Sequence, residues 1–487
     1  MAQSIFPDLL FTADRPENKI SAETFDDLRL TALLPEHTLD DAGYLLGEED
    51  IRARREVFSC LTDPGFRGRM QTLLSAAEEL GETDALYGAA RSDSERDVIY
   101  VTLASRLLAF YKAAAALSGS GELLSRFNSF FTAQTGMSWF DRTSSALENV
   151  LPMVTGLLKN RVCFITKGES IRVKDSPKST YLQTIAECAE GLGLPRPVPD
   201  VKEANPLSMN IISGVVKALP DEFAAFAAFR KEMGKFYDRA VLSYIGQLRF
   251  YLGFASAFDR VTAAGIPLIF PTISNEKKID VRSAYDITLL AKDDMKIIPN
   301  DILFTADEPF FYLTGANGGG KTTYLRAVGT TAVMFALGCP VACESAEMSI
   351  PDGIYTHFPR DERFDENGRF MDDQNRVDAI LAKADGSSIV LLNETYSTTT
   401  EDIAVNLTSS LASRLYNTGV FGLYITHQLG ISQNQIPYLN VVVDHTDANR
   451  RTYKVERRRA DSSSYARDIL LKYRLTREQL GERFGEV

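Results

Sequence analysis

Hydrophobic and polar positions follow different periods in the two halves of the chain. Between about residues 92 and 265, apolar residues recur every three or four positions, as they do in amphipathic helices. The stretch SDSERD offers Ser92 or Ser94 as an N-cap before the first of these helices. After Pro267, short apolar runs alternate with helical stretches, which is typical of a parallel α/β sheet. The pattern therefore predicts a helical region followed by an α/β domain.

The longest helical signal begins at Asp221, directly after a proline, and continues to Phe258. Its apolar residues keep helical spacing throughout and stop at a glycine and proline breaker. As one continuous helix it would be roughly 65 Å long at about 1.5 Å per residue. Such a helix is either a lever that transmits motion or a core helix of a bundle, and the pattern leaves both open. Gly234, Gly246 and Gly253 each weaken a continuous helix by about 1 kcal/mol.

Two short basic stretches are candidates for phosphate contacts. Residues 162–179 have an alternating character that predicts a small β excursion between helices. The basic residues of this excursion are Lys167, Arg172, Lys174 and Lys178. The run RRTYKVERRR, residues 450–459, lies where the α/β sheet is expected to end. Both stretches have a second interpretation as solvated surface, and we favour it for each.

Composition and charge limit the class of protein. A chain of 487 residues corresponds to roughly two to four domains. The net charge of −12 and the pI near 5.1 exclude a uniformly basic surface, so any nucleic-acid contact must be local. The N-terminus lacks the pattern of a signal peptide, and no apolar run reaches about 18 residues. Five cysteines without metal-ligand spacing suit a reducing compartment, so we expect a cytoplasmic protein that does not enter a membrane.

The segment FFYLTGANGGGKTTYLRAVG contains a glycine-rich loop between a predicted strand and a predicted helix. Gly315 is followed by four residues and then by Gly320 and Lys321, which is the spacing of a phosphate-binding loop. The glycines let successive backbone N–H groups point at phosphates; Lys321 would reach the β- and γ-phosphate oxygens, and the Thr322 hydroxyl would bind Mg²⁺. The predicted nucleotide-binding residues are Gly315, Ala316, Asn317, Gly318, Gly319, Gly320, Lys321, Thr322 and Thr323.

The segment SSIVLLNETYSTTT predicts a buried parallel strand that ends in Asn393 and Glu394. Nucleotide-hydrolysing sites of this design normally carry Asp at the first of these two positions. An amide there removes one negative charge, a gross loss for Mg²⁺ on the order of several kcal/mol at an effective dielectric near 20. Thr322 and Asn393 are the predicted Mg²⁺ ligands, and we expect weakened metal affinity with nucleotide binding retained.

Lys321, Glu394 and His427 are the predicted catalytic residues. Glu394 is placed to orient or deprotonate a water molecule. His427 follows the apolar strand FGLYIT at the neighbouring strand edge, where it would contact a γ-phosphate. Each has a plainer interpretation: Glu394 as a strand-end carboxylate paired with a basic neighbour, and His427 as a core histidine. The surrounding motifs favour catalysis, so we expect slow ATP turnover.

The glycine-rich loop resembles that of the MutS family of DNA mismatch repair proteins, which are ABC-type ATPases. TGANGGGKTTYLR is similar to the family's TGPNMGGKSTYMR, with Ala316 in place of proline. The similarity continues through GCPVACESAEMSIPDGIYTHF, SIVLLNE, YITHQL and SSSYARDILLKYRLTREQL, so that it covers residues 298–480. Upstream it is weaker: residues 51–58 resemble the family's entry into its core domain, and the long helix resembles its lever.

The resemblance implies an α/β P-loop (ABC-type) ATPase domain that lies C-terminal to a mostly α-helical core and lever domain. The expected divisions are an N-terminal connector with the start of the helical core, the helical core and lever, the ATPase domain, and a C-terminal helical dimerisation segment, at residues 1–91, 92–266, 267–460 and 461–487. The resemblance also implies ATP and Mg²⁺ as cofactors and a homodimer that holds nucleotide between its subunits. Where the family has Ser and Thr to approach the partner subunit's γ-phosphate, this sequence has Gly368 and Arg369. Arg369 is either a substitute positive charge or a surface arginine.

Two functions are compatible with these features. The first is a nucleotide-switched dimeric clamp that binds structured or mismatched DNA in repair or recombination. The second is a protein-interaction scaffold whose shape is set by nucleotide, with little hydrolysis. No counterpart of the family's mismatch-reading domain is expected, because the sequence before Ile51 has no room for one. A transporter-coupled ATPase fits poorly, since no membrane segment is predicted.

Overall fold

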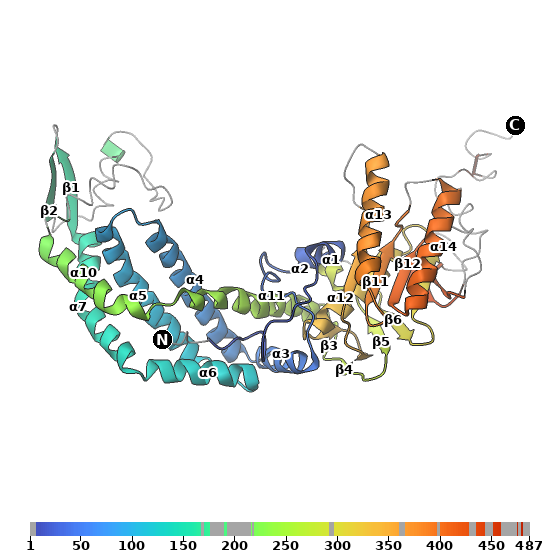
Figure 1. Ribbon diagram of the computed structural model, residues 1–487, viewed down its shortest axis with the longest axis horizontal. Helices are drawn as coiled ribbons and strands as arrows, with labels where there is room; N and C mark the ends of the chain where they lie inside the picture. The colour runs from blue at the N-terminus through green and yellow to red at the C-terminus, as the bar shows by residue number, and fades with distance from the viewer. Residues whose placement is uncertain are drawn as a thin grey trace. The chain divides into compact units, whose positions relative to one another are not determined.

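The protein is described by a computed structural model that forms two compact units (Figure 1). The residues it describes are 6–166, 170–175, 189–191, 216, 219–291, 297–359, 366–396, 400–427, 435–443, 451–458, 475 and 479–480. We call Met1–Leu9 together with Thr62–Leu248 the helical unit, and Leu10–Leu61 together with Arg249–Val487 the sheet unit. Residues 1–91, expected to be an N-terminal connector with the start of the helical core, are divided between the two units, and residues 10–61 lie in the sheet unit.

The helical unit is built around α5, which packs against four other helices. Its helices are α4 (Pro64–Ala89), α5 (Asp93–Ala116), α6 (Glu122–Thr135), α7 (Ser138–Asn160) and α10 (Pro220–Met233). Ser92 is the N-cap of α5, since its hydroxyl accepts a hydrogen bond from the Glu95 N–H. By length and hydropathy, α5 is the one described helix that passes as a membrane span, yet 50% of its most apolar window is buried inside the protein. Its four helical neighbours identify it as the core helix of this unit.

The predicted β excursion is confirmed. β1 (Arg161–Thr166) and β2 (Ser170–Asp175) form an antiparallel pair in which Arg161 lies opposite Asp175. Two of the basic residues noted in this stretch, Lys167 and Lys178, lie outside the described residues.

The helical signal from Asp221 to Phe258 does not correspond to one continuous helix. α10 ends at Met233, two 3₁₀ turns follow at Gly234–Phe236 and Arg239–Ser243, and α11 then runs from Tyr244 to Ala263. The residue that ends η1, Tyr237, has extended backbone angles, as does the next residue, Asp238. Asp238 then caps the following turn by accepting a hydrogen bond from the Ala240 N–H at 2.9 Å. The glycine after Met233 and this capping carboxylate stop the helix. Both helices are buried, so apolar residues keep helical spacing on either side of the break.

The sheet unit contains a six-stranded sheet with the strand order β10-β11-β12-β7-β13-β14. Its strands are β7 (Phe310–Gly315), β10 (Ile354–His357), β11 (Ile389–Asn393), β12 (Phe421–Ile425), β13 (Tyr438–Val443) and β14 (Arg451–Glu456). Neighbours are parallel except for β13 and β14, which are antiparallel. Every residue of β7, β11 and β12 is buried, as expected of parallel strands covered on both faces.

Helices cover the two faces of this sheet. α13 (Glu366–Lys383) and α14 (Glu401–Thr418) lie side by side on one face, where both contribute to one hydrophobic cluster with the strands (Figure 1). α12 (Lys321–Ala336) packs against strands β7, β10, β11 and β12. Its contact with Leu391, a residue outside that cluster, places α12 on the opposite face.

Smaller sheets complete this unit. β3 (Leu268–Ile269) pairs with β8 (Val341–Ala342). The four-stranded sheet has the order β4-β9-β5-β6, and its strands are β4 (Thr272–Ile273), β9 (Ser345–Met348), β5 (Lys278–Ala284) and β6 (Asn300–Thr305). A 3₁₀ turn, η3 (Ile287–Ala291), follows β5.

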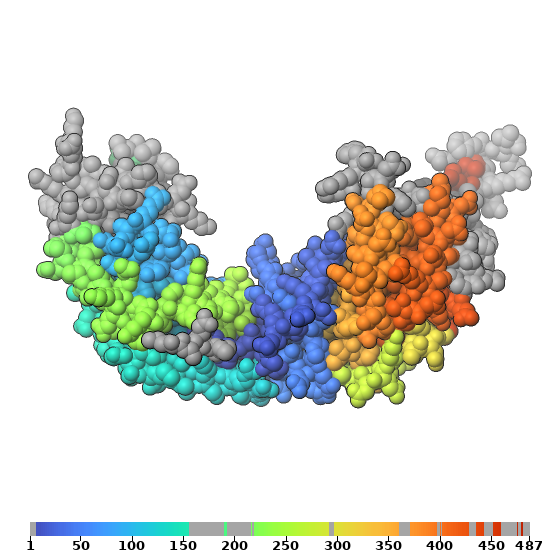
Figure 2. Space-filling view, in the orientation of Figure 1, coloured from blue at the N-terminus to red at the C-terminus, as the bar shows by residue number. Residues whose placement is uncertain are grey.

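The first part of the sheet unit, Leu10–Leu61, is called here the N-terminal segment. Its helices are α1 (Ala22–Asp27), α2 (Leu30–Leu33) and α3 (Glu48–Cys60). Figure 2 shows this segment, in blue, directly against the orange surface of the sheet unit. The fully buried Leu28 packs so closely on Gly329 of α12 that a Cβ on this glycine would lie 2.3 Å from the Leu28 Cδ2. The N-terminal segment is therefore part of the core around α12.

A fully buried arginine, Arg54 of α3, joins the N-terminal segment to the end of α12. Its guanidinium donates hydrogen bonds to the carbonyls of Leu10 at 2.9 Å, Ala42 at 3.3 Å and Leu337 at 3.2 Å. Leu337 is the C-cap of α12, so the positive charge meets the negative end of the helix dipole. The guanidinium also lies over the ring of Phe250 in α11, 4.9 Å from its centroid.

Candidate functional site

The glycine-rich loop joins the end of β7 to the start of α12. Gly315, Gly318 and Gly320 have φ values of 128°, 70° and 100°, a region that other residues rarely adopt. A Cβ on Gly315 would also lie 2.9 Å from both the side-chain oxygen of Asn440 and the backbone nitrogen of Val441. Only glycine fits there, and the loop curls so that it ends in the N-terminus of α12. Such a terminus presents unpaired N–H groups and the positive end of a helix dipole, which together suit an anion.

The first residue of α12, Lys321, is a buried cation at the base of this loop, with 6% of its surface exposed. Its Nζ donates to the carbonyl oxygens of Gly315 at 2.9 Å and Ala316 at 3.2 Å, and lies 3.4 Å from Oδ1 of Asn317. Burial lowers the pKa of Lys321 to about 8, while the carboxylate of Glu394 acts in the opposite direction. The ammonium group is therefore held within the loop, where it can meet a bound anion.

Glu394 and His427 meet at the carboxyl ends of two neighbouring strands, β11 and β12. The Nε2 of His427 lies 2.7 Å from the Oε1 of Glu394, where an N–H on that nitrogen donates to the carboxylate. This hydrogen bond lowers the pKa of Glu394 against the opposing effect of partial burial, and the charge of Lys321 lowers it further. Glu394 is consequently ionised at neutral pH and free to accept a proton from water.

The backbone of Glu394 is in the left-handed region, with φ of 51°. For residues other than glycine this conformation costs about 1–2 kcal/mol. A hydrogen bond from the Glu394 N–H to the Ile425 carbonyl of β12, at 3.0 Å, holds the backbone in this conformation. Strain of this kind commonly accumulates where a side chain must be aimed at a site.

Asn393, the last residue of β11, is 9% exposed, and its Oδ1 has no hydrogen-bond partner among the described residues. Side chains alternate along a strand, so Asn393 faces the same side as Leu391, which is the side of α12. A buried oxygen without a donor costs about 1–3 kcal/mol, and a bound cation would remove that cost. Together with the hydroxyl of Thr322 in the first turn of α12, this oxygen fits Mg²⁺, which prefers oxygen ligands.

Several predicted residues are not brought into this cluster by the described part of the structure. Gly368 and Arg369 lie in the first turns of α13, and their side chains are outside the described residues. Thr322 and Thr323, in contrast, follow Lys321 in the first turn of α12 at the glycine-rich loop, both partly buried. Most of the expected dimerisation segment, residues 461–487, is also outside the description.

Tyr453 is a neighbour of the glycine-rich loop that sequence reasoning missed. It lies on the edge strand β14, within the basic run, and its ring is 3.2 Å from the position of a Cβ on Gly320. Its φ of 57° and the hydrogen bond from the Asn300 side chain to its carbonyl, 3.0 Å, hold it there. The alternating pattern of this strand gave no sign of a contact with the loop. Most of the run is partly or fully exposed, in line with a solvated strand.

His357, at the end of β10, was also missed. It is fully buried, and its Nε2 lies 3.1 Å from Oδ1 of Asp373 on α13. The two residues therefore bring α13 and the end of β10 into contact. Among the described residues, no group of three or more His, Cys, Asp or Glu side chains could hold a metal ion.

Comparison with known proteins relates this geometry to a family. A family model described as MutS domain V matches residues 311–485, which include the loop, β11, β12 and the site between them. DNA mismatch repair protein MutS of Fervidobacterium nodosum is 30% identical over 154 residues, 31% of this chain and 19% of the relative. MSH2 of Saccharomyces cerevisiae is 30% identical over 204 residues, 39% of this chain and 21% of the relative. MutS of Petrotoga mobilis is 36% identical over 124 residues, 25% of this chain and 15% of the relative.

These alignments span at most about a fifth of each relative's length. The glycine-rich loop, the buried lysine and the carboxylate at the strand end all fall within the matched residues. Residues 311–485 are therefore similar to domain V of the MutS family.

Proposed function

We propose that the sheet unit is a P-loop ATPase that binds ATP with Mg²⁺ and hydrolyses it slowly. The observation that carries the proposal is the contact of 2.7 Å between Glu394 and His427, beside a buried lysine and an anion-binding helix N-terminus. A carboxylate alone at a strand end would be compatible with many roles. A carboxylate oriented by a histidine, next to a cradle for phosphates, supports activation of a water molecule.

The phosphates would be bound by backbone N–H groups of the loop and by the ammonium group of Lys321, which would exchange its loop carbonyls for phosphate oxygens. Thr322 and Asn393 would hold Mg²⁺ through a hydroxyl and an amide oxygen. When bound, the metal ion neutralises charge that develops on the phosphate oxygens. Because one of its two protein ligands is an amide, the ion is held less tightly than by a carboxylate.

Glu394 supplies the general base for hydrolysis. It accepts a proton from the attacking water as the oxygen bonds to the γ-phosphorus and the bond to the β-phosphate oxygen breaks. ADP and inorganic phosphate are the products. His427 holds the carboxylate in its strained orientation and lies near the transferred group, while Lys321 stabilises the phosphate charge.

The assembly we propose is a cytoplasmic homodimer that binds DNA as a nucleotide-switched clamp in repair or recombination. Similarity to the MutS family over residues 311–485 supports this, since the relatives are named as DNA mismatch repair proteins. In such a dimer, Gly368 and Arg369 approach the partner subunit's nucleotide, and Arg369 supplies positive charge. The net charge of −12 requires that the DNA contact be a local surface.

A second candidate function is a nucleotide-dependent interaction scaffold with little hydrolysis. The observation that favours it is the amide of Asn393 at the metal position, because weak Mg²⁺ binding would slow the chemical step.

One set of measurements on the purified protein tests both functions. Binding to branched and to duplex DNA is measured at several salt concentrations, with and without ATP, beside ATP turnover. A clamp shows salt-sensitive binding that changes with ATP, together with measurable turnover. Absence of DNA binding under all conditions would favour the scaffold, and ATP binding without any turnover would contradict the proposed hydrolysis.

ATP affinity is expected to fall as the pH rises above about 8. The pKa of Lys321 is about 8 before nucleotide binds, and phosphates bind the charged form of lysine. Nucleotide binding therefore raises the pKa of Lys321. When the pH is above the pKa of the nucleotide-free protein, each binding event requires uptake of a proton, and the affinity for ATP decreases by at most about tenfold per pH unit. Titrations with a fluorescent nucleotide between about pH 7 and 9 measure the effect. Lys321→Arg stays charged over this range and should show no such decrease; an equal decrease would assign it to another group.

A further inference from the structure

Asp27, the last residue of α1, connects the N-terminal segment to three elements of the sheet unit. Its Oδ2 accepts a hydrogen bond from the Thr356 hydroxyl of β10 at 2.7 Å and another from the Arg376 guanidinium of α13 at 3.2 Å. Its backbone carbonyl accepts a hydrogen bond from Arg326 of α12 at 3.0 Å. The side chains of Asp27 and Arg376 are only 9% and 17% exposed. The ion pair is thus largely shielded from water, where its geometry matters more than at a surface.

Arg376 fixes α13 to the edge of the sheet at the same point. Its Nη1 donates to the Phe358 carbonyl just after β10, at 3.1 Å, while Nη2 donates to Asp27. A guanidinium that bridges a carbonyl and a carboxylate has a fixed plane, so it defines the position of the helix that carries it. In the first turns of α13, Arg369 lies seven residues before Arg376, which is about two turns or 10 Å along the helix axis.

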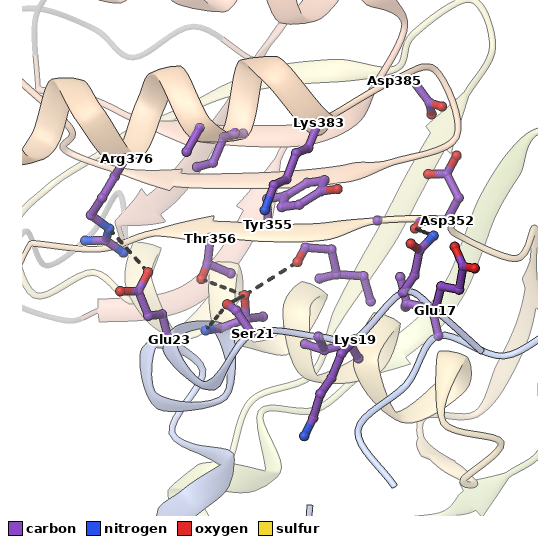
Figure 3. Close-up of a pocket in the computed structure, with 18 residues that line it drawn as sticks. Glu17, Lys19, Ser21, Glu23, Asp352, Tyr355, Thr356, Arg376, Lys383 and Asp385 are labelled. Carbon is purple, nitrogen blue, oxygen red and sulfur yellow. Dashed lines mark hydrogen bonds and ion pairs between the residues drawn. The ribbon is translucent and has the colours of Figure 1, made fainter. Parts of the chain in front are cut away.

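Beyond Arg376, α13 borders a pocket of about 740 Å³ between itself, β10 and the N-terminal segment (Figure 3). Ala379, Ile380 and Lys383 of α13 line this pocket. In Figure 3 Arg376 points toward Glu23 of α1, and the two side chains are 3.8 Å apart. On the side that faces the N-terminal segment, α13 is therefore held at Arg376 and faces open space over the next two turns.

We propose that Asp27 is a positioning residue for the partner subunit's nucleotide site, acting through Arg376 on α13. This inference rests on the dimer of the proposed function, in which the first turns of α13 approach the partner's ATP. The N-terminal segment thereby takes part in ATP hydrolysis although it lies almost 300 residues before the glycine-rich loop. Because Arg326 donates a hydrogen bond to the backbone carbonyl of Asp27, a change of the side chain leaves that hydrogen bond to α12 in place.

The substitution Asp27→Asn tests the proposal. The amide keeps the shape of the side chain and an oxygen for Thr356, but it removes the charge that holds Arg376. We expect turnover of the full-length homodimer to fall about tenfold, as small misplacements of catalytic groups do, with ATP affinity unchanged. Asp26→Asn is the matched control, because Asp26 is exposed on the same helix and accepts a hydrogen bond from Thr31. It should retain the wild-type rate.

Mixing two defective proteins separates a positioning role from a folding defect. Lys321→Ala loses its own nucleotide site but keeps a correctly placed α13. In a hybrid dimer this α13 completes the nucleotide site of the Asp27→Asn subunit. Half of the dimers in an equal mixture are hybrids, and each has one intact site of two, so recovery to about a quarter of the wild-type rate is expected. Arg376→Gln, in place of Asp27→Asn, should be rescued in the same way.

Each outcome decides the matter. Wild-type turnover by Asp27→Asn would overturn the proposal, and so would a mixture that stays inactive while wild-type protein mixed with Lys321→Ala forms active hybrids. An unfolded Asp27→Asn protein would give no rescue, and Arg376→Gln would then carry the test. If wild-type turnover per subunit does not depend on dimer formation, the proposed dimeric site fails instead, and that failure is seen without any variant.

Discussion

Replacing Glu394 by glutamine is expected to lower ATP turnover by about 10²- to 10⁴-fold while ATP affinity stays close to that of the wild-type protein. Glutamine has nearly the same size, and its amide oxygen can still accept the hydrogen bond from His427. It has no basic oxygen to take a proton from water, so only the chemical step is lost. The measurement is the single-turnover rate with saturating ATP and Mg²⁺, beside a nucleotide-binding titration.

Glu308→Gln is the control for this experiment. Glu308 is a glutamate of the same unit that pairs with Arg457 near the surface, and its neutralisation should leave turnover unchanged. If the wild-type protein and Glu394→Gln bind ATP equally and both show no turnover, Glu394 is a strand-end carboxylate without a catalytic role. The second candidate function, the scaffold, would then account for the nucleotide site.

Asn393→Asp is expected to lower the Mg²⁺ concentration needed for half-maximal turnover by about 10- to 100-fold. The substitution places a full negative charge where the buried Oδ1 of Asn393 lacks a donor, and the attraction to a divalent cation at short range is worth several kcal/mol before water and phosphates compensate. Without Mg²⁺ the same charge is buried and unpaired, so the thermal midpoint should drop and then recover when the metal is added. Turnover and thermal unfolding, each titrated with Mg²⁺, measure the two effects.

Asn440→Asp is the matched comparison, since Asn440 is another buried asparagine whose Oδ1 lacks a partner among the described residues. It lies on β13 beside Gly315, on the other side of β7 from β11. A charge there should destabilise the protein without increasing its affinity for Mg²⁺. An equal gain of Mg²⁺ affinity in both variants would show that a negative charge anywhere near the loop is sufficient to strengthen Mg²⁺ binding. It would then contradict a specific role of Asn393 as a metal ligand.

The sequence predicted the features that depend on local pattern. The strands β7, β11 and β12 are continuous apolar runs, and parallel strands buried on both faces require such runs. Their carboxyl ends meet at one edge, which is why Glu394 and His427, 33 residues apart, come within hydrogen-bond distance. The roles of these residues stay predictions until the substitutions above are measured.

The features that were not predicted depend on contacts between distant parts of the chain or on single residues that outweigh a pattern. The apolar period from Asp221 to Phe258 is real, but Asp238 and the glycine after Met233 end the helix without disturbing that period. No local sequence signal indicates that Leu28 packs on Gly329, because neither residue departs from the pattern of the segment in which it lies. Tyr453 reaches Gly320 only because β14 pairs with the strand next to the loop.

The packing of Leu28 into Gly329 bears on where this protein can be cut. The residues that align with the MutS family begin at Phe311, yet the helix after the glycine-rich loop is closed on one side by Leu28 and at its end by Arg54. A shortened protein that begins near residue 267 would leave that side of α12 open to water and the carbonyl of Leu337 without its arginine. The smallest autonomous folding unit around the proposed ATP site is thus discontinuous in sequence, and its limits are those of the hydrophobic core instead of those of the segment that matches the family model.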